Sequence, residues 1–258
     1  MANIKSLAKS FVTAFATYSK IPMPKISWAE ENMKYAVCFF PLVGAVIGGV
    51  WLLWLYLAER CGFTPLFRAA VATLIPIIIS GGIHLDGFCD IADAFSSWQP
   101  REKKLEILKD PHVGAFAIIG CGCYLLAYCG AMSELSPGRA AATCACGFVL
   151  SRALSALALV NFRSARPKGM LDTVAQASHK RVVTTVSVIY IIICGAVMAD
   201  ISLQYCAAAL LACAASFWLY HRLAYKKLGG TTGDMAGWFV QVCELAIPYF
   251  IIAGGALL

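Results

Sequence analysis

The chain has 258 residues, of which 60% are hydrophobic and 14% are charged, and its mean hydropathy is +0.74. A soluble domain is about half apolar and about a quarter charged, so this composition excludes an ordinary soluble protein and predicts one that lies mostly in a lipid bilayer. The formal net charge of +7 would attract anionic lipid headgroups or a polyanionic substrate, and no nucleic-acid-binding motif accompanies it. We therefore expect membrane lipids and small molecules as partners, and no nucleic acid.

Residues 1–35 are expected to form an N-terminal arm at the membrane interface. From Ile4 to Phe15, apolar residues recur at helical spacing among the lysines, which fits a short amphipathic helix on the membrane surface. A helix packed against the rest of the protein fits the pattern equally well. The arm has no apolar run that ends in a small-residue cleavage site, so it does not resemble a cleaved signal peptide. The apolar positions are Ile4, Leu7, Ala8, Phe11, Val12 and Phe15.

Seven later stretches have the composition of transmembrane helices, which need about 20 mostly apolar residues. The second stretch is the weakest, because Pro76 interrupts it and the pair Gly81 and Gly82 ends it early. We therefore expect an all-α, polytopic integral membrane protein in which residues 1–258 form a single membrane-embedded domain. The stretches are roughly 36–58, 67–84, 113–133, 140–160, 182–199, 201–220 and 235–257.

The lysines and arginines of the connecting segments predict the orientation. Seventeen of them lie in the N-terminal segment and in the loops 85–112, 161–181 and 221–234, whereas the opposite face has only three. Basic residues accumulate on the cytoplasmic side of membrane proteins, so the N-terminus is expected in the cytoplasm and the C-terminus outside. The alternation of basic and non-basic connections also favours an odd number of spans.

The peptide GGIHLDGFCDIADAF, residues 81–95, carries three acids at this basic face. If it is helical, the side chains of Asp86, Asp90 and Asp93 project within an arc of about 60°. Three like charges this close repel one another, and some would be protonated unless a cation lay between them. Mg²⁺ binds carboxylate oxygens and shares its shell with water and substrate phosphates, so the three aspartates are predicted magnesium ligands and catalytic residues. The alternative is a plain helix end whose acids face water.

A second polar segment is LGGTTGDMAGWFVQVCE, residues 228–244. Its glycine-rich bend leads directly into the last span, and backbone N–H groups at the start of a helix bind phosphate. Gly230, Thr232 and Gly233 are therefore predicted to contact substrate phosphates. The alternative is that the bend needs glycine only for its backbone conformation.

Acidic and basic residues complete this group. Asp234, at the start of the last span, is a further catalytic candidate, and Glu244 lies inside that span, where an acid is a candidate metal ligand. Pairing of Glu244 with Arg152 of the fourth span, which would only neutralise a buried charge, fits equally well. Cationic side chains bind phosphate, so Arg152, Arg166 and Lys109 are assigned to substrate phosphates, with a purely topological role as the alternative.

Metal-binding carboxylates, a glycine-rich bend and arginines at one membrane face indicate transfer chemistry on a diphosphate. A carboxylate of the cluster would accept the proton of the attacking hydroxyl. The residues by themselves give this reaction type and no substrate. Topology alone explains several other lysines of the same face, namely Lys103, Lys104, Lys180 and Lys227.

The two peptides quoted above occur in one order with four shorter segments, and together they resemble cobalamin synthase, the adenosylcobinamide-GDP ribazoletransferase family. The first is similar to the family signature GG-hydrophobic-HLDG-x-x-D-x-x-D, and the second to the block GG-x-TGD-x-x-G…E. The resemblance extends over nearly the whole chain. The shorter segments are IPMP (21–24), FPLVG (40–44), ILKDPHVGAF (107–116) and the block made of SRALSALAL (151–159) and FRSARPKGM (162–170).

The resemblance implies a Mg²⁺-dependent enzyme of bacterial or archaeal membranes, here expected in the bacterial inner membrane. Such an enzyme joins adenosylcobinamide-GDP to α-ribazole or its 5′-phosphate, releases GMP, and forms adenosylcobalamin or its 5′-phosphate. Its single catalytic domain would span the membrane several times, with the active site on the cytoplasmic face. Further copies of the chain and other enzymes of cobalamin assembly are the expected protein partners.

The resemblance also implies residue roles. Asp86, Asp90 and Asp93 would bind Mg²⁺, and one of them would also serve as the base. Asp234 and Glu244 would be ligands or orienting groups of a second cluster, and Arg166 would contact a phosphate.

Two other functions fit parts of the pattern. A CDP-alcohol phosphotransferase runs similar chemistry in membranes, but its motif D-x-x-D-G-x-x-A-R fails here, because Asp90 and Ile91 stand where Ala and Arg are required. A divalent-cation transporter would place its acids near the midplane of the bilayer on broken helices. Here the acids lie at one face together with phosphate-binding cations, which favours the transferase.

Overall fold

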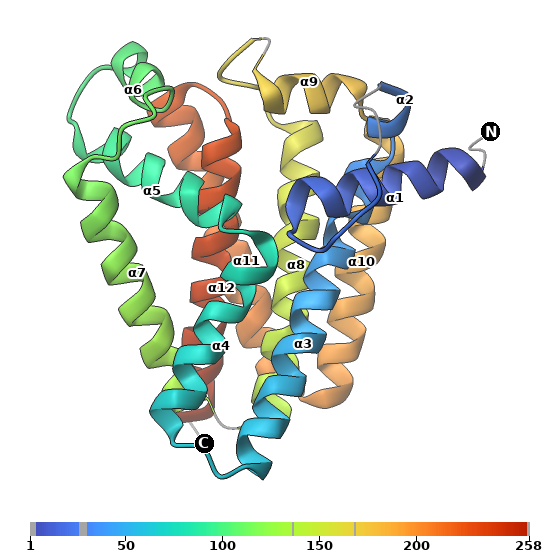
Figure 1. The fold of residues 1–258 in the computed structure, drawn as a ribbon, viewed down its shortest axis with the longest axis vertical. Helices are drawn as coiled ribbons and strands as arrows, with labels where there is room; N and C mark the ends of the chain where they lie inside the picture. Colours follow the sequence, from blue (N-terminus) through green and yellow to red (C-terminus); the bar gives the residue numbers. More distant parts are fainter. Residues whose placement is uncertain (1–3, 26–29, 136, 168, 257–258) are drawn as a thin grey trace.

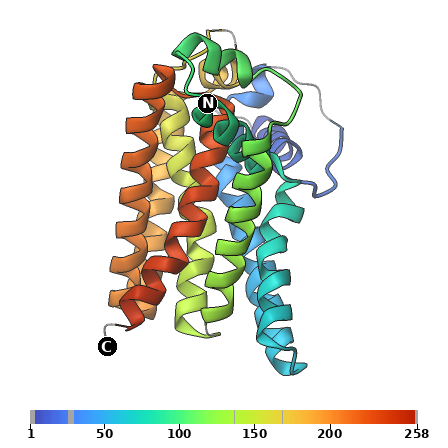
Figure 2. The same cartoon turned by 90° about the vertical axis from the view of Figure 1, so that its left-hand side faces the viewer.

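The computed structural model describes residues 4–25, 30–135, 137–167 and 169–256. These residues are organised as helices, and the β-type contact among them is an isolated bridge between Ser164 and Thr231. Figures 1 and 2 show long helices that run side by side, with short helices gathered at one end. The predicted all-α membrane architecture is confirmed.

Within the described ranges, six helices are long and apolar enough to cross a bilayer. Large apolar side chains such as Leu126 (77% exposed) and Leu203 (76% exposed) point outward from them, where lipid and not water is the favourable surrounding. Six of the seven expected stretches coincide with these helices to within a few residues. The helices are η1 with α3 (Ala36–Phe39 and Phe40–Arg60), α7 (Ala115–Glu134), α8 (Arg139–Asn161), α10 (Lys180–Ile201), α11 with η2 (Leu203–Leu223 and Ala224–Leu228) and α12 (Gly233–Ala256).

The second expected span, roughly 67–84, belongs to a bent pair of helices, and its first helix ends early at the glycine pair, as the sequence predicts. Helix α4 (Pro65–Ser80) ends at Gly81, and α5 (Ile83–Ser96) continues at an angle of 97° to it. Gly81 and Gly82 have φ values of 67° and 77°, a left-handed conformation that glycine adopts without steric cost. Pro76 lies inside α4 and does not end it. The bend turns α5 across the bundle, as Figure 1 shows, and with it the three aspartates.

The N-terminal arm packs against the bundle. Helix α1 (Ile4–Tyr18) buries Ala14 and Phe15, whereas Ala8 is exposed. The backbone N–H of Lys20 donates a hydrogen bond to the carbonyl oxygen of Ile79 in α4 at 2.8 Å. Of the two alternatives for this arm, these contacts agree with the helix packed against the rest of the protein. Residues 1–3 and 26–29 of the arm lie outside the described residues.

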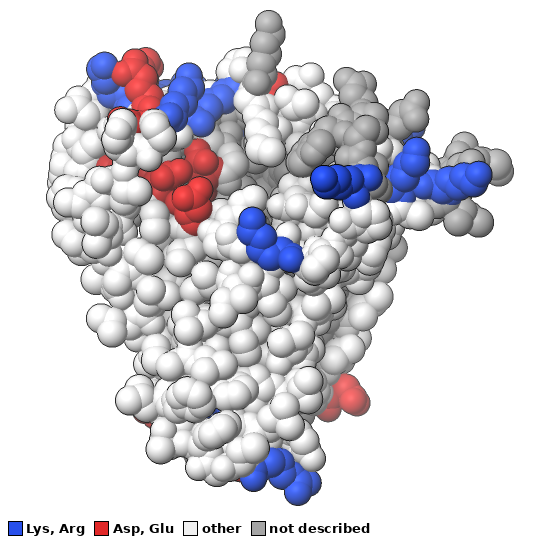
Figure 3. All heavy atoms as spheres, in the orientation of Figure 1, with Lys and Arg blue, Asp and Glu red and all other residues white. Residues whose placement is uncertain are grey.

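The short helices mark one end of the bundle, which we call the basic end. It carries α2 (Glu30–Met33), α6 (Arg101–Ile107), α9 (Met170–Ala177) and the bend between η2 and α12, while the C-terminus lies at the opposite end (Figure 1). Most of the lysines and arginines visible in Figure 3 lie at this end. The loops that the sequence groups on one basic face are therefore close together in space.

Candidate active site

The site lies where helix α5 crosses the beginning of α12. A Cβ atom on Gly87 of α5 would stand 2.8 Å from the carbonyl oxygen of Asp234. A Cβ atom on Gly237 of α12 would stand 3.1 Å from the carbonyl oxygen of His84. Because glycine has no side chain, the two helix backbones touch at this crossing. The contact brings Asp86 and Asp234, which are far apart in the sequence, to the same part of the molecule.

Asp86 and Asp234 line one cavity of about 320 Å³, which we call the catalytic cavity. Arg166, from the loop between α8 and α9, lines the same cavity, so two acids and one guanidinium group face a common space. Figure 3 shows an acidic patch in a recess below the basic rim of the molecule. The volume is in the range of small-molecule binding sites. Other residues that line it include His84, Ser164, Asp172, Thr232 and Gly233.

Arg166 connects this cavity to helix α6. Its Nη2 donates a hydrogen bond to the carbonyl oxygen of Leu105 at 3.0 Å, and its Nη1 lies 3.6 Å from Oδ2 of Asp234. The side chains of Arg166 and Asp234 are 21% and 25% exposed, so the pair is partly shielded from bulk water. Nε of Arg166 and Oδ2 of Asp234 have no hydrogen-bond partner among the described residues, although both atoms are buried. Both atoms therefore keep unused hydrogen-bonding capacity.

Asp86 and Asp90 lie one turn apart on α5. Asp86 is exposed, and it faces both the catalytic cavity and a second cavity of about 590 Å³ beside Lys20. Asp90 is half-buried, and it feels the negative charges of Asp86, Asp234 and Asp93 together with the positive charge of Arg166. Because like charges in a partly buried site repel, the cluster favours a bound cation.

Asp93 has a different role from the predicted one. Its Oδ2 accepts a hydrogen bond from the backbone N–H of Gly114 at 2.7 Å, and its Oδ1 accepts one from the N–H of Ala117 at 2.8 Å. Both oxygens thus cap the N-terminus of α7, where free N–H groups and the helix dipole stabilise a negative charge. The predicted metal ligation by Asp93 is corrected to a positioning role, since the carboxylate holds α5 against α7.

The glycine-rich bend only partly enters the catalytic cavity. Gly230 packs against residues 163–165, because a Cβ atom on it would stand 2.8 Å from the backbone nitrogen of Ala165. The prediction that Gly230 contacts phosphate is therefore corrected: the residue permits close backbone packing. Thr232 and Gly233 do line the cavity, and Oγ1 of Thr232 also accepts a hydrogen bond from the N–H of Met235 at 3.1 Å, which caps α12.

Arg152 and Glu244 form an ion pair in the interior of the bundle. Nη1 of Arg152 donates to Oε1 of Glu244, and the hydroxyl of Ser151 donates to the same oxygen at 3.0 Å. Both charged side chains are 1% exposed. Glu244 lies ten residues after Asp234 on α12, which is about 15 Å along the helix axis. The predictions of metal binding by Glu244 and substrate binding by Arg152 are thus corrected in favour of the buried pair.

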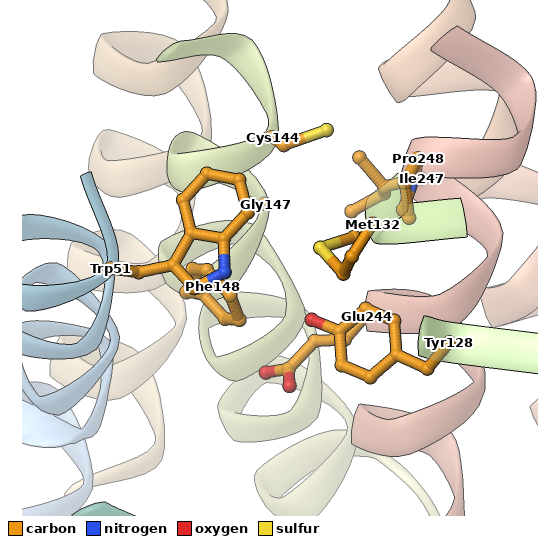
Figure 4. Close-up of a pocket in the computed structure, with 9 residues that line it drawn as sticks. All are labelled: Trp51, Tyr128, Met132, Cys144, Gly147, Phe148, Glu244, Ile247 and Pro248. Carbon is orange, nitrogen blue, oxygen red and sulfur yellow. The ribbon is translucent and has the colours of Figure 1, made fainter. Parts of the chain in front are cut away.

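The surroundings of Glu244 support this correction. Glu244 lines a cavity of only about 10 Å³ enclosed by α3, α7, α8 and α12 (Figure 4). A space of this size accommodates about one water molecule and no substrate. The residues around it are Trp51, Tyr128, Met132, Cys144, Gly147, Phe148, Ile247 and Pro248.

Lys109 does not line either of the cavities beside Asp86, because it is exposed on the loop between α6 and α7. In the same loop, Asp110 accepts a hydrogen bond from the backbone N–H of His112 at 3.0 Å and lies 2.6 Å from Nδ1 of the same residue, and these contacts hold the pKa of Asp110 below its usual range. This part of the predicted site is a local turn.

Three glycines that sequence reasoning did not assign are essential to the geometry. Gly87 and Gly237 allow α5 and α12 to touch, and Gly114 leaves room for the carboxylate of Asp93.

The family model for cobalamin-5-phosphate synthase matches residues 10–252. The chain belongs to the cobalamin-5-phosphate synthase family. Three relatives named adenosylcobinamide-GDP ribazoletransferase show how far the similarity extends. The protein of Lachnoclostridium phytofermentans is 48% identical over 246 residues, which cover 95% of this chain and 94% of that protein. The protein of Brevibacillus brevis is 32% identical over 95% of this chain and 98% of that protein. The protein of Ralstonia nicotianae is 29% identical over 98% of this chain and 98% of that protein. No solved structure matches the chain.

For this member of the cobalamin-5-phosphate synthase family, the donor atoms fit a magnesium ion that the substrate helps to bind. In the described part of the chain, no three acid, histidine or cysteine side chains converge on a metal position. Mg²⁺ does not require such a group, because it keeps several waters and binds one or two carboxylates together with substrate phosphates. Asp86 and Asp234 supply two such carboxylates on one cavity.

Proposed function

We propose that the protein joins adenosylcobinamide-GDP to α-ribazole or its 5′-phosphate in a Mg²⁺-dependent reaction that releases GMP. The names of its relatives and the order of its sequence motifs support these substrates. The observation that carries the proposal is the catalytic cavity, which Asp86, Asp234 and Arg166 all line. The basic end would face the cytoplasm of a bacterial cell, because it carries the excess of lysine and arginine.

The reaction forms one bond and breaks one bond at the phosphorus attached to the cobinamide arm. The hydroxyl oxygen of the ribazole bonds to this phosphorus, the bond to the oxygen of GMP breaks, and the hydroxyl proton passes to an aspartate of the α5 cluster. Asp86 and Asp234 would hold the metal, and Nε and Nη1 of Arg166 would donate to phosphate oxygens. Bound Mg²⁺ would neutralise the diphosphate and stabilise the leaving phosphate.

The other residues position these groups. Asp93 fixes α5 on α7 through the N-terminal cap, and Gly87 sets the distance between α5 and α12. The Arg152–Glu244 pair connects α8 to α12 deeper in the bundle. Together these contacts determine where the carboxylates lie before any substrate binds.

The test is GMP release by purified protein from adenosylcobinamide-GDP and α-ribazole 5′-phosphate, with and without EDTA. Asp86→Asn and Asp234→Asn keep the side-chain volume and remove the charge, and each should lower the rate by at least about 100-fold. Asp200→Asn, at an exposed position at the far end of α10, makes the same chemical change outside the cavity and should leave the rate unchanged. A folded Asp86→Asn protein with full EDTA-sensitive GMP release would refute the assignment.

A further inference from the structure

A further cavity at the basic end takes no part in the chemistry described above. It has a volume of about 420 Å³ and lies between the end of α5, helix α6 and η2. We call it the basic pocket. The residues that line it are Phe95, Trp98, Gln99, Arg101, Lys104, Lys226 and Lys227.

Four of these residues are cations, and none is an acid. Lys104 is buried (5% exposed) and donates to the carbonyl oxygen of Gln99. The ion pairs among the described residues do not include Arg101, Lys226 or Lys227. The positive-inside rule explains why lysines occur on this face but not why four cations from two elements surround one cavity. Such an arrangement is unfavourable by itself and favours a bound anion.

An aromatic side chain stands beside these cations. Trp98 is 95% exposed, so its indole ring is unusually open to solvent for an apolar group. Its φ angle is 54°, a left-handed conformation that is rare outside glycine and that tends to occur at ligand-binding positions. A flat exposed ring next to several cations can bind a nucleotide, with the base on the ring and the phosphates on the cations.

The basic pocket and the catalytic cavity share two walls. Arg101 packs against Gly229 at one end of the glycine-rich bend, and Thr232 and Gly233 at its other end line the catalytic cavity. Helix α6 carries Arg101 and Lys104 on the side of the basic pocket, and its Leu105 carbonyl binds Arg166 of the catalytic cavity. The two spaces are therefore neighbours at the basic end, on either side of the glycine-rich bend and helix α6.

We propose that the basic pocket binds the nucleotide part of the substrate, a nucleoside phosphate, with Trp98 stacked on the base and Arg101, Lys226 and Lys227 on phosphate oxygens. This assignment rests on the proposed function, because the nucleotide is the part of adenosylcobinamide-GDP that leaves. The pocket also binds the released nucleoside monophosphate.

The probe is GMP, titrated calorimetrically into the full-length protein in nanodiscs of phosphatidylcholine, with EDTA present so that no metal contributes. Trp98→Ala should weaken binding by about tenfold or more, and Trp98→Phe, which keeps a stacking face, should retain most of it. The double substitution Lys226→Ala and Lys227→Ala should weaken binding by about tenfold. Lys180→Ala with Arg181→Ala removes two exposed cations of the same face outside the pocket and should have no effect.

Kinetics separates a binding role from a structural one. The pocket variants should raise KM for adenosylcobinamide-GDP by the same factor as the dissociation constant for GMP, while kcat changes by less than about threefold. Loss of kcat together with an unchanged KM would overturn the assignment.

Two further outcomes distinguish this proposal from the proposed function. Asp86→Asn should stop the transfer and leave GMP binding unchanged. A failure of the proposed function is therefore seen in the transfer assay, and a failure of the nucleotide site is seen in the GMP titration. If GMP does not bind the wild-type protein, or binds the pocket variants equally well, the pocket is not a nucleotide site. A third outcome is that the wild type co-purifies with phosphatidylglycerol and does not bind GMP, whereas the double variant has lost the lipid. The pocket would then be a lipid site, which also overturns the proposal.

Discussion

The substitution Gly87→Ala tests whether the contact between α5 and α12 sets the geometry of the active site. The new Cβ atom would stand 2.8 Å from the carbonyl oxygen and 2.9 Å from the Cα atom of Asp234, both of which are backbone atoms that cannot rotate away. Because non-bonded carbon atoms rest at about 3.5–4.0 Å, the helices must separate by about 0.5–1 Å. Asp86 would move relative to Asp234 by a similar amount.

This displacement should affect activity much more than stability. Overpacking costs about 1–3 kcal/mol, and the better helix propensity of alanine offsets about 1 kcal/mol of that. A shift of reacting groups by about 1 Å lowers a rate by about 100-fold, so kcat for GMP release should fall by about 10- to 100-fold.

Gly122→Ala is the matched control, since Gly122 lies within α7 with open space around the position of a Cβ atom. It should be as active as the wild type and equally or more stable. The reasoning would be refuted by a Gly87→Ala protein with wild-type kcat and a wild-type thermal midpoint.

Three other predictions follow from the contacts of the bundle. Asp93→Ala removes the cap of α7 and should lower the stability by about 0.5–2 kcal/mol, seen as a lower thermal midpoint in one detergent; an unchanged midpoint would contradict the capping role. Arg152→Met leaves Glu244 charged and unpaired and should destabilise the protein by about 3–5 kcal/mol. Adding Glu244→Leu should restore much of the lost stability. Equal instability of the single and double variants would show that the loss of charge pairing does not cause the destabilisation. Cys61 is exposed at the end of α3 away from the basic end, so a membrane-impermeant maleimide should label it in intact cells, and Cys61→Ser should abolish that signal; labelling only after lysis would reverse the orientation.

The sequence by itself determined the spans and the gathering of functional groups on one face. Hydropathy is a property of about 20 consecutive residues, so six spans could be located without knowledge of their neighbours. The positions of Asp86 and Asp90 on one side of a helix also follow from local periodicity, because residues four apart share a face. Arg166 and Asp234 were assigned from the chemistry of their side chains and from motif resemblance, and both line the catalytic cavity.

Only the tertiary structure decided which of these groups meet. Asp93 lies on the same helical stripe as Asp86, but the N-terminus of α7 occupies it, and no local pattern in α5 reveals that neighbour. Glu244 has the composition of a ligand in a membrane span, yet the rotation of α12 against α8 directs it to Arg152. Helix crossings depend on contacts between residues far apart in the chain, such as Gly87 with Asp234, and these contacts determine where each charge lies.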